Sequence, residues 1–356
     1  MCSPMFQRPA SPSPFWNGGG AVVGAGSLMG EIASDAVLDA AYEWLCRRRR
    51  EAPSCHDVWH LRWSWPEEKP RLQAELLGGS FRLGPSRRIL TEAGAMEFWS
   101  SRDAVVVKAV ALVFSRRFAG ALGSGCFNAV GRGGVKGAVR AVAEAVPDYE
   151  FVYRSDVRKY YASLEPEVVF SLVERVVRDP LVLDWIWRYL HRAIYVDGGY
   201  VASRGLPRGC PLSPVLGAMC LRDVDASVEG LGVVFVRFMD DWVVLARSRW
   251  VLRRAVRRIR EVVARLRLEL APDKTFVGRV SRGFDFCGYF FDGVRVGVSR
   301  AAISRFVERV HRLYEQGASD GRVGEYVGHW VRWVGSGLGG GASHGKVVAK
   351  GLRRSR

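Results

Sequence analysis

Three aspartates in two separate segments are the residues of this chain best suited to metal-dependent chemistry. The segment VRFMDDWVVLA, residues 236–246, places Asp240 and Asp241 between two apolar runs that are rich in β-branched residues. The segment EFVYRSDV, residues 150–157, has the pattern of a short apolar strand and reaches Asp156 near its end. Burying like charges side by side is costly unless a cation neutralises them, so these positions call for an explanation.

Two interpretations of Asp240 and Asp241 are open. An exposed hairpin turn is the simpler one, because aspartate is common in turns. Asp156 favours a metal site: if its strand lies beside the 233–246 hairpin, three carboxylates meet on one sheet. Such oxygen ligands suit Mg²⁺, and two ions held this way can clamp the attacking and leaving oxygens of a phosphoryl transfer.

The elements that must position these aspartates predict an antiparallel α+β fold, because hairpins and helices alternate irregularly along the chain. Residues 53–100 are rich in Trp and Pro, and short strand candidates lie around LLGGSFRLGPSRRIL, residues 76–90. The segments KTFVGRV and FDFCGYFF each predict one short strand. Predicted helices cover about 35–50, 101–118, 165–179, 180–194, 211–230, 250–268, 301–316 and 322–335. The apolar stripe of the 301–316 helix comprises Ile303, Phe306, Val307, Val310, Leu313 and Tyr314.

The composition indicates a phosphate-rich partner. Lys and Arg total 53 against 36 Asp and Glu, a net charge of +17 with a pI near 10. Nucleic acid is the leading candidate, and an anionic membrane surface is the alternative. No apolar run approaches the roughly 18–20 residues that a spanning helix needs. The helix at 250–268 leaves many arginines outward, either as a solvated face or as a surface for a nucleic-acid backbone. Its predicted buried residues are Val256, Ile259, Val263 and Leu266.

The seven scattered cysteines predict free thiols in a reducing cytoplasm. Cys46, Cys55, His56 and His60 are too widely spaced for the usual zinc knuckle, so we interpret them as core and surface residues. The Gly131–Gly137 loop does not have the spacing of a phosphate-binding loop, and we interpret it as a turn before a helix.

The two ends of the chain are rich in Gly and in Ser or basic residues. Residues 1–30 predict a disordered lead that makes a poor signal peptide, and Met29 is an alternative start. Residues 338–356 predict a basic disordered tail.

Five short motifs occur in a specific order. They are YRSDVRKYY, RGLPRGCPLSP, FMDD, PDKT and FDFCGY. Their order and spacing resemble those of reverse transcriptases, RNA-directed DNA polymerases, and most closely the bacterial group II intron and retron-like branch. Each motif alone is weak, but five in order are specific. The resemblance extends over about residues 35–335.

This resemblance implies a right-hand polymerase with fingers, a ferredoxin-like antiparallel palm and a short helical thumb. Residues 31–150 would form the fingers and N-terminal region. Residues 151–294 would form the palm, with part of 157–210 contributing to the fingers, and residues 298–337 would form the thumb.

The resemblance also assigns the catalytic residues. Asp156 and Asp240 would be the principal ligands of two Mg²⁺ ions, with Asp241 beside them and Mn²⁺ as a substitute metal. Lys274 would protonate the departing pyrophosphate. A solvated turn lysine is the competing interpretation of Lys274.

The family's nucleotide-binding positions fall on residues from several segments. Tyr161 would be the aromatic gate that excludes a ribose 2′-hydroxyl, whereas the residue taken alone favours a core aromatic. Arg208 stands where the family usually has Gln, which adds a positive charge beside the triphosphate. The full implied nucleotide-binding set is Val157, Tyr161, Arg208, Gly209, Arg87 and Arg88. The implied primer grip is a hairpin that carries Phe286, Gly288 and Tyr289, and a strand with alternating core residues is the other interpretation of these three.

The implied activity is addition of deoxynucleotides to a DNA or RNA primer on an RNA template. A dedicated non-coding RNA, a retroelement or phage-defence setting, a cytoplasmic location and no membrane partner complete the expectation. Three alternatives stay open: a non-catalytic, maturase-like RNA-binding cofactor, a two-metal nuclease or strand transferase, and a template-independent DNA polymerase.

Overall fold

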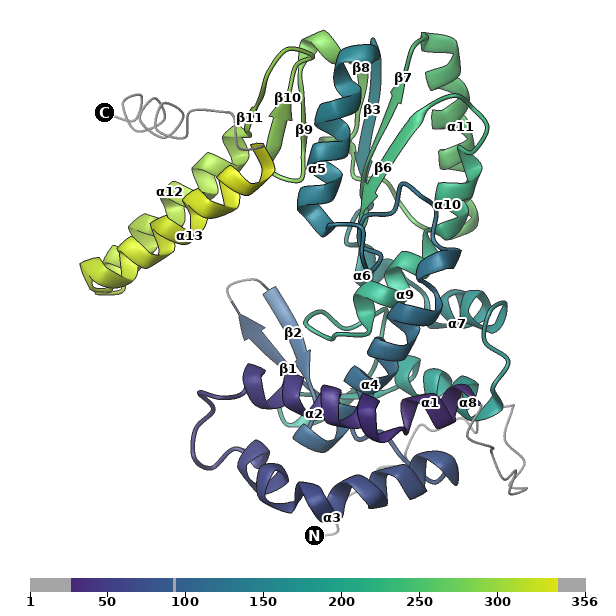
Figure 1. Ribbon diagram of the computed structural model, residues 1–356, viewed down its shortest axis with the longest axis vertical. Coiled ribbons are helices and arrows are strands. Elements are labelled where there is room, and N and C mark those ends of the chain that lie inside the picture. The colour runs from purple at the N-terminus through teal and green to yellow at the C-terminus, as the bar shows by residue number, and fades with distance from the viewer. Residues whose placement is uncertain (1–26, 92–93, 339–356) are drawn as a thin grey trace. The chain divides into compact units, whose positions relative to one another are not determined.

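The computed structural model describes residues 27–91 and 94–338, and its chain divides into two compact units (Figure 1). Unit 1 combines the chain up to residue 121 with residues 159–220. Unit 2 combines residues 122–158 with the chain from residue 221 onward. Each unit is therefore assembled from segments that are not contiguous in the sequence. Helices and mostly antiparallel sheets make up both units, as an α+β fold requires.

Unit 1 is mainly helical and carries one four-stranded sheet with the order β2-β1-β4-β5, in which only the β1–β4 pair is parallel. Its helices are α1 (Leu28–Ile32), α2 (Asp35–Arg48), α3 (Asp57–Leu77), α4 (Ser101–Arg117), α6 (Tyr160–Ser163), α7 (Pro166–Glu174), α8 (Pro180–Leu190) and α9 (Ser213–Cys220), and its strands are β1 (Ser86–Thr91), β2 (Gly94–Phe98), β4 (Ala193–Val196) and β5 (Gly199–Ala202), with one 3-10 turn at Ala119–Ala121.

The helix α3 was not predicted from the sequence, whereas β1 lies in the segment that carried the strand candidates. The helix runs for 21 residues and continues through Pro66 and Pro70. Both prolines are exposed, so the backbone groups left unpaired by a proline face water. The high Trp and Pro content made the helical spacing of the apolar residues difficult to recognise in the sequence. The buried residues of α3 are Val58, Leu61, Trp65, Leu72 and Leu76.

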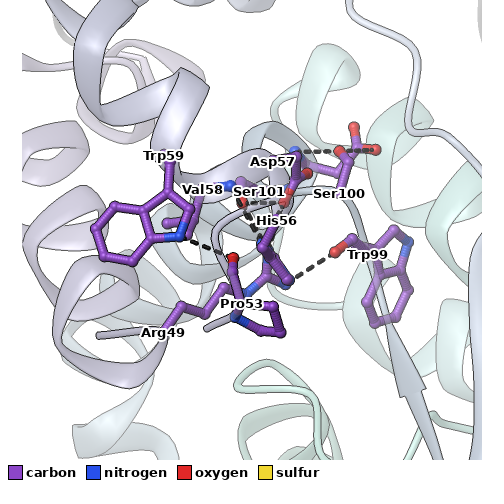
Figure 2. A network of polar contacts seen from close by, with 10 residues as sticks. Arg49, Pro53, His56, Asp57, Val58, Trp59, Trp99, Ser100 and Ser101 are labelled. Carbon is purple, nitrogen blue, oxygen red and sulfur yellow. Dashed lines mark hydrogen bonds and ion pairs between the residues drawn. The ribbon is translucent and has the colours of Figure 1, made fainter. Parts of the chain in front are cut away.

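A polar network joins the ends of α2, α3 and α4 (Figure 2). The Asp57 carboxylate accepts hydrogen bonds from the backbone N–H and the hydroxyl of Ser101, both at 2.6 Å. The Arg49 guanidinium donates to the Ser101 hydroxyl at 2.7 Å and to the Trp99 carbonyl at 2.8 Å. Burial raises the pKa of Asp57, but the Ser101 hydrogen bonds outweigh it and hold that pKa below its usual value. The network is structural and fixes three helix ends.

The cysteine and histidine residues near this network do not form a zinc site. His56 caps α3, because its Nδ1 accepts the Val58 N–H at 3.2 Å. Cys46 is buried and Cys55 is exposed, and all six described cysteines are free thiols.

Over residues 27–91 and 94–338, no helix is long and apolar enough to cross a membrane.

The first described residues correct part of the expected disordered lead. Ser27 caps α1 by accepting the Gly30 N–H at 2.9 Å, and Met29 is buried in the core. The Met29 N–H also donates to the Asp179 carboxylate at 2.9 Å. Residues 27–30 therefore belong to unit 1. The rest of the predicted lead, 1–26, and the predicted tail from 339 onward lie outside the described residues.

Unit 2 contains an antiparallel sheet with the order β6-β7-β3-β8 and a smaller antiparallel sheet with the order β11-β10-β9. Its strands are β3 (Phe151–Asp156), β6 (Val234–Phe238), β7 (Asp241–Ala246), β8 (Phe276–Arg279), β9 (Phe284–Phe286), β10 (Tyr289–Phe291) and β11 (Val296–Val298), and its helices are α5 (Gly134–Ala145), α10 (Arg222–Ser227), α11 (Arg249–Arg265), α12 (Arg300–Glu315) and α13 (Asp320–Leu338), with 3-10 turns at Val146–Asp148, Pro272–Lys274 and Val280–Arg282.

The larger sheet of unit 2 is covered on both faces, which explains the continuous burial of β7. Val243 and Leu245 share a core with α5 and with the β9–β10 hairpin. Alternation along the strand sends Trp242 and Val244 to the other face, on which α11 packs (Figure 1). In α11 the predicted residues Ile259, Val263 and Leu266 are buried, while Val256 is half-buried. The same alternation places Asp241 on the face of Val243.

The segment FDFCGYFF forms the β9–β10 hairpin, as the resemblance implied, whereas its local pattern alone predicted one short strand. Its turn residues Cys287 and Gly288 have φ of 48° and 84°, which matches the turns that favour glycine at two-residue hairpins. A Cβ at Gly288 would lie 2.8 Å from the Trp333 ring of α13. Conformation and close packing therefore both demand glycine at this position.

The helices α12 and α13 form an antiparallel pair whose rings interlock, with Phe306 stacked on Trp330 at 4.1 Å between centroids. The predicted apolar stripe of α12 is wrong at one position, because Tyr314 is 54% exposed while Leu313 is buried. Tyr314 is the last aromatic residue of α12, one residue before the helix ends at Glu315.

Candidate active site

Asp156 and Asp241 face each other across two paired strands of unit 2. They form the last pair of the antiparallel β3–β7 ladder. Asp240 directly precedes Asp241 in the β6–β7 turn, where Met239 adopts a left-handed backbone with φ of 57°. The pairing of the 151–156 strand with the hairpin, on which the metal hypothesis depended, is therefore present.

A buried ion pair fixes the turn that carries Asp240. Arg237 is fully buried, and its guanidinium donates two hydrogen bonds of 2.6 Å to the Asp225 carboxylate of α10. Its third nitrogen donates to the Met239 carbonyl at 2.9 Å. Paired geometry of this kind is what makes a buried charge tolerable. The sequence analysis did not assign Arg237, although an arginine inside the apolar strand VFVRF was a signal for it.

Two cations contact the carboxylates. The Lys274 ammonium donates to the Asp156 carboxylate at 2.8 Å, so this predicted residue is brought to the site. The Arg154 guanidinium lies 3.4 Å from the Asp241 carboxylate and donates to the Lys274 carbonyl at 3.1 Å. Arg154 and Asp156 are two residues apart on β3 and so share a face. The motif YRSDVRKYY contained Arg154, but the sequence analysis gave it no role.

The two cations do not balance the negative charge of the site. Burial raises the pKa of Asp240 to about 6, and the charge of Asp156 adds to the effect. Burial likewise raises the pKa of Asp241 to about 6, although Arg154 opposes the shift. The hydrogen bond to Asp156 raises the pKa of Lys274, which stays protonated at neutral pH. A further cation near Asp240 and Asp241 would be stabilised by this field.

We tested whether these residues fit a metal ion. Among residues 27–91 and 94–338, no three His, Cys, Asp or Glu side chains are grouped closely enough to ligate one. Lys274 already neutralises Asp156. One Asp241 oxygen, however, is buried and accepts no hydrogen bond. Carboxylate oxygens are the donors that Mg²⁺ prefers, so the chemistry of these donor atoms fits Mg²⁺.

The predicted primer-grip residues lie on the β9–β10 hairpin beside the carboxylates. The Cys287 N–H donates to the Asp241 carboxylate at 3.4 Å. Phe286 and Tyr289 are fully buried in the unit 2 core. The Tyr289 hydroxyl accepts from the Lys136 ammonium at 2.5 Å and donates to the Trp333 carbonyl at 2.9 Å. Both aromatic side chains therefore support the hairpin from within.

Most predicted nucleotide-binding residues lie in unit 1, and three of them meet at the β1–β2 hairpin. The Glu97 N–H of β2 donates to the Arg208 carbonyl at 3.1 Å. A Cβ at Gly209, whose φ is 84°, would lie 2.5 Å from the Met96 side chain. The Arg88 guanidinium lies 3.8 Å from the Glu97 carboxylate. Arg88, Arg208 and Gly209 thus share one neighbourhood within this unit.

The remaining nucleotide-binding candidates have separate surroundings. Arg87 is exposed and stacks over the Tyr195 ring at 5.7 Å. Tyr161 is half-buried, and its carbonyl accepts the Leu206 N–H at 2.7 Å. A Cβ at Gly217 would lie 3.2 Å from the Tyr161 ring, so glycine leaves room for that ring. Val157 belongs to unit 2 and is buried.

The comparison with known protein families matches the part of the chain that carries this candidate site. Residues 125–291 match the family described as reverse transcriptase (RNA-dependent DNA polymerase). The matched region includes all three aspartates and Lys274, and it ends with the last residue of β10. Residues 125–291 of the chain are therefore a reverse transcriptase domain. No curated protein matches the chain significantly.

Proposed function

We propose that this protein is an RNA-directed DNA polymerase that adds deoxynucleotides to a DNA or RNA primer on an RNA template. The observation that carries the proposal is the facing pair Asp156 and Asp241, with Asp240 beside them, inside the matched domain. In this proposal unit 2 supplies the palm, α12 and α13 the thumb, and unit 1 the fingers. A bacterial retroelement or phage-defence system with its own RNA is the setting that the motifs favour.

Asp156, Asp240 and Asp241 would hold two Mg²⁺ ions, with Mn²⁺ as a substitute. When bound, the metal would activate the primer 3′-hydroxyl and stabilise charge on the transferring phosphate. With pKa values of about 6, Asp240 and Asp241 are ionised at neutral pH and available as ligands. Arg154 orients Asp241 from the neighbouring strand position.

Lys274 would act on the leaving group. The Lys274 side chain is 48% exposed, and its ammonium contacts Asp156. A protonated amine at this place can give a proton to the departing pyrophosphate as general acid. Its contact with Asp156 would hold it near the reacting phosphates.

Unit 1 would select the incoming nucleotide. The ring of Tyr161, backed by Gly217, would exclude a ribose 2′-hydroxyl. Arg88 and Arg208 would bind the triphosphate from the β1–β2 hairpin, together with Arg87. Gly209 supports this role because it lets the backbone approach Met96 closely.

Primer extension on an RNA template tests the proposal. We expect Mg²⁺-dependent DNA synthesis by the wild type, which Asp240→Ala abolishes. Ribonucleotides in place of deoxynucleotides should give little product, and Tyr161→Ala should increase it. Synthesis without a template would indicate a template-independent polymerase. Absence of synthesis on generic templates and on RNA that co-purifies with the protein would instead favour a non-catalytic RNA-binding cofactor.

A further inference from the structure

The outer side of α11 in unit 2 is a continuous basic surface. The helix contains seven arginines and one glutamate, Glu261. Leu252, Ala255 and Ile259 are buried against the sheet, so the arginines occupy the opposite side. A 17-residue helix is about 25 Å long. We call its exposed arginines the arginine face: Arg249, Arg253, Arg254, Arg257, Arg260 and Arg265.

Little of this charge is neutralised within the helix. Arg257 lies 3.9 Å from Glu261, and both side chains are well exposed, so the pair contributes little. Arg258 is not part of the arginine face, because it donates to the Ser227 carbonyl of α10 at 3.3 Å. Concentrated positive charge of one sign raises the local concentration of polyanions.

An exposed aromatic ring lies at the beginning of the arginine face. Trp250 is 59% exposed. The guanidinium groups of Arg249 and Arg253 lie 4.9 and 5.0 Å from its ring centroid and hold the ring. An aromatic ring between arginines is the arrangement on which unpaired bases stack while the arginines contact phosphates.

The arginine face lies on the other side of the sheet from Asp156 and Asp241. On β3, Tyr153 points to one face of the sheet, while Arg154 and Asp156 point to the other. Tyr153 pairs with Val244 of β7, which lies on the face where α11 packs, so α11 lies on the Tyr153 side. A nucleic acid segment bound at these aspartates therefore lies on the opposite side of the sheet from the arginine face.

We propose that the arginine face with Trp250 is a second RNA-binding surface, which takes an unpaired stretch of RNA outside the catalytic centre. Its charge matches phosphates, and Trp250 supplies the stacking platform. An anionic membrane fits less well, because a helix that lies on a membrane needs several apolar residues on its outer side. The exposed large apolar side chain of α11 is Trp250.

Fluorescence anisotropy with a labelled, unstructured RNA of about twenty nucleotides tests this surface directly. The variant Arg249→Gln, Arg253→Gln, Arg254→Gln removes three charges around Trp250. The matched control Arg47→Gln, Arg48→Gln, Arg50→Gln removes three exposed charges near the end of α2. We expect at least about tenfold weaker binding for the first variant, and a salt slope reduced by about 2. We expect less than about twofold for the control.

A second pair of variants isolates stacking. Trp250→Ala should weaken RNA binding about fivefold or more, whereas Trp63→Ala, at an 81% exposed tryptophan of α3, should not. Equal losses in the test and control variants would overturn the proposal. So would arginine-face variants that lose binding to vesicles of anionic phospholipid and keep RNA binding. The measurement needs no polymerisation, so its outcome is independent of the proposed function.

Discussion

Asp156 and Asp241 stand directly opposite each other at the end of the β3–β7 ladder, an arrangement of like charges that destabilises a sheet. Two cations contact this pair: Lys274 contacts Asp156, and Arg154 contacts Asp241. Natural proteins keep such unfavourable pairs at sites where a ligand or a reaction uses them. The free-energy cost of these buried carboxylates can be measured from the dependence of stability on pH and on Mg²⁺.

The stability of the metal-free protein should fall as pH rises from about 4 to above 6. The folded pKa of Asp240 is about 6, above its usual 3.8, so the folded state binds more protons in this range. Urea unfolding in EDTA should show that Asp240→Asn removes roughly 1–3 kcal/mol of this loss. The matched control Asp273→Asn, at an exposed aspartate, should retain the wild-type pH dependence. An unchanged slope in Asp240→Asn would contradict the raised pKa.

Mg²⁺ should stabilise the wild type more at pH 7.5 than at pH 5, because protons compete with the metal for Asp240 and Asp241. The increase in melting temperature with Mg²⁺ measures this linkage. Asp241→Asn should reduce the increase, and Asp273→Asn should not. A Mg²⁺ effect of the same size at both pH values would argue against carboxylate ligation.

Lys274→Met should lower kcat by about 10²-fold or more if its ammonium is the general acid. Lys274→Arg keeps a charge for Asp156 but gives up a proton less readily, so it should restore folding stability without restoring kcat. Single-turnover rates compare the three proteins. Full kcat in Lys274→Arg would indicate that Lys274 only positions Asp156.

Arg237→Met should destabilise unit 2 by roughly 3–5 kcal/mol, because it leaves the Asp225 carboxylate buried without its partner. The double variant Arg237→Met, Asp225→Leu should recover part of that loss. As a control, Arg47→Met breaks an exposed pair with Glu43 and should cost less than about 1 kcal/mol. Chemical denaturation measures all three, and equal costs at both sites would refute the anchoring role.

Lys136→Met should weaken template–primer binding several-fold with little change in kcat. Lys136 lies 3.9 Å from the Trp333 ring centroid and donates to the Tyr289 hydroxyl, so it joins α5, the β9–β10 hairpin and α13. Burial lowers the pKa of Lys136 to about 8, so wild-type binding should fall between pH 7 and 9 and the variant should lack this step. Lys108→Met, at a lysine over Trp44, is the matched control.

The sequence by itself determined the local features of this protein. The alternation of β7 and the apolar period of α11 were legible because each depends on neighbouring residues alone. The ordered motifs all lie within residues 125–291, the segment that matches the reverse transcriptase family. The long helix α3 was missed because its prolines, exposed and harmless in place, are strong breaker signals in a sequence.

The tertiary structure decided which residues meet. Residues 159–220, which lie between β3 and β6 in the sequence, belong to unit 1. Asp156 can therefore pair with Asp241 only after two segments separated by these residues come together. The contacts of Lys274 with Asp156, and of Arg237 with Asp225, also join separate elements. Such contacts depend on register and packing between distant segments, which local residue patterns do not encode.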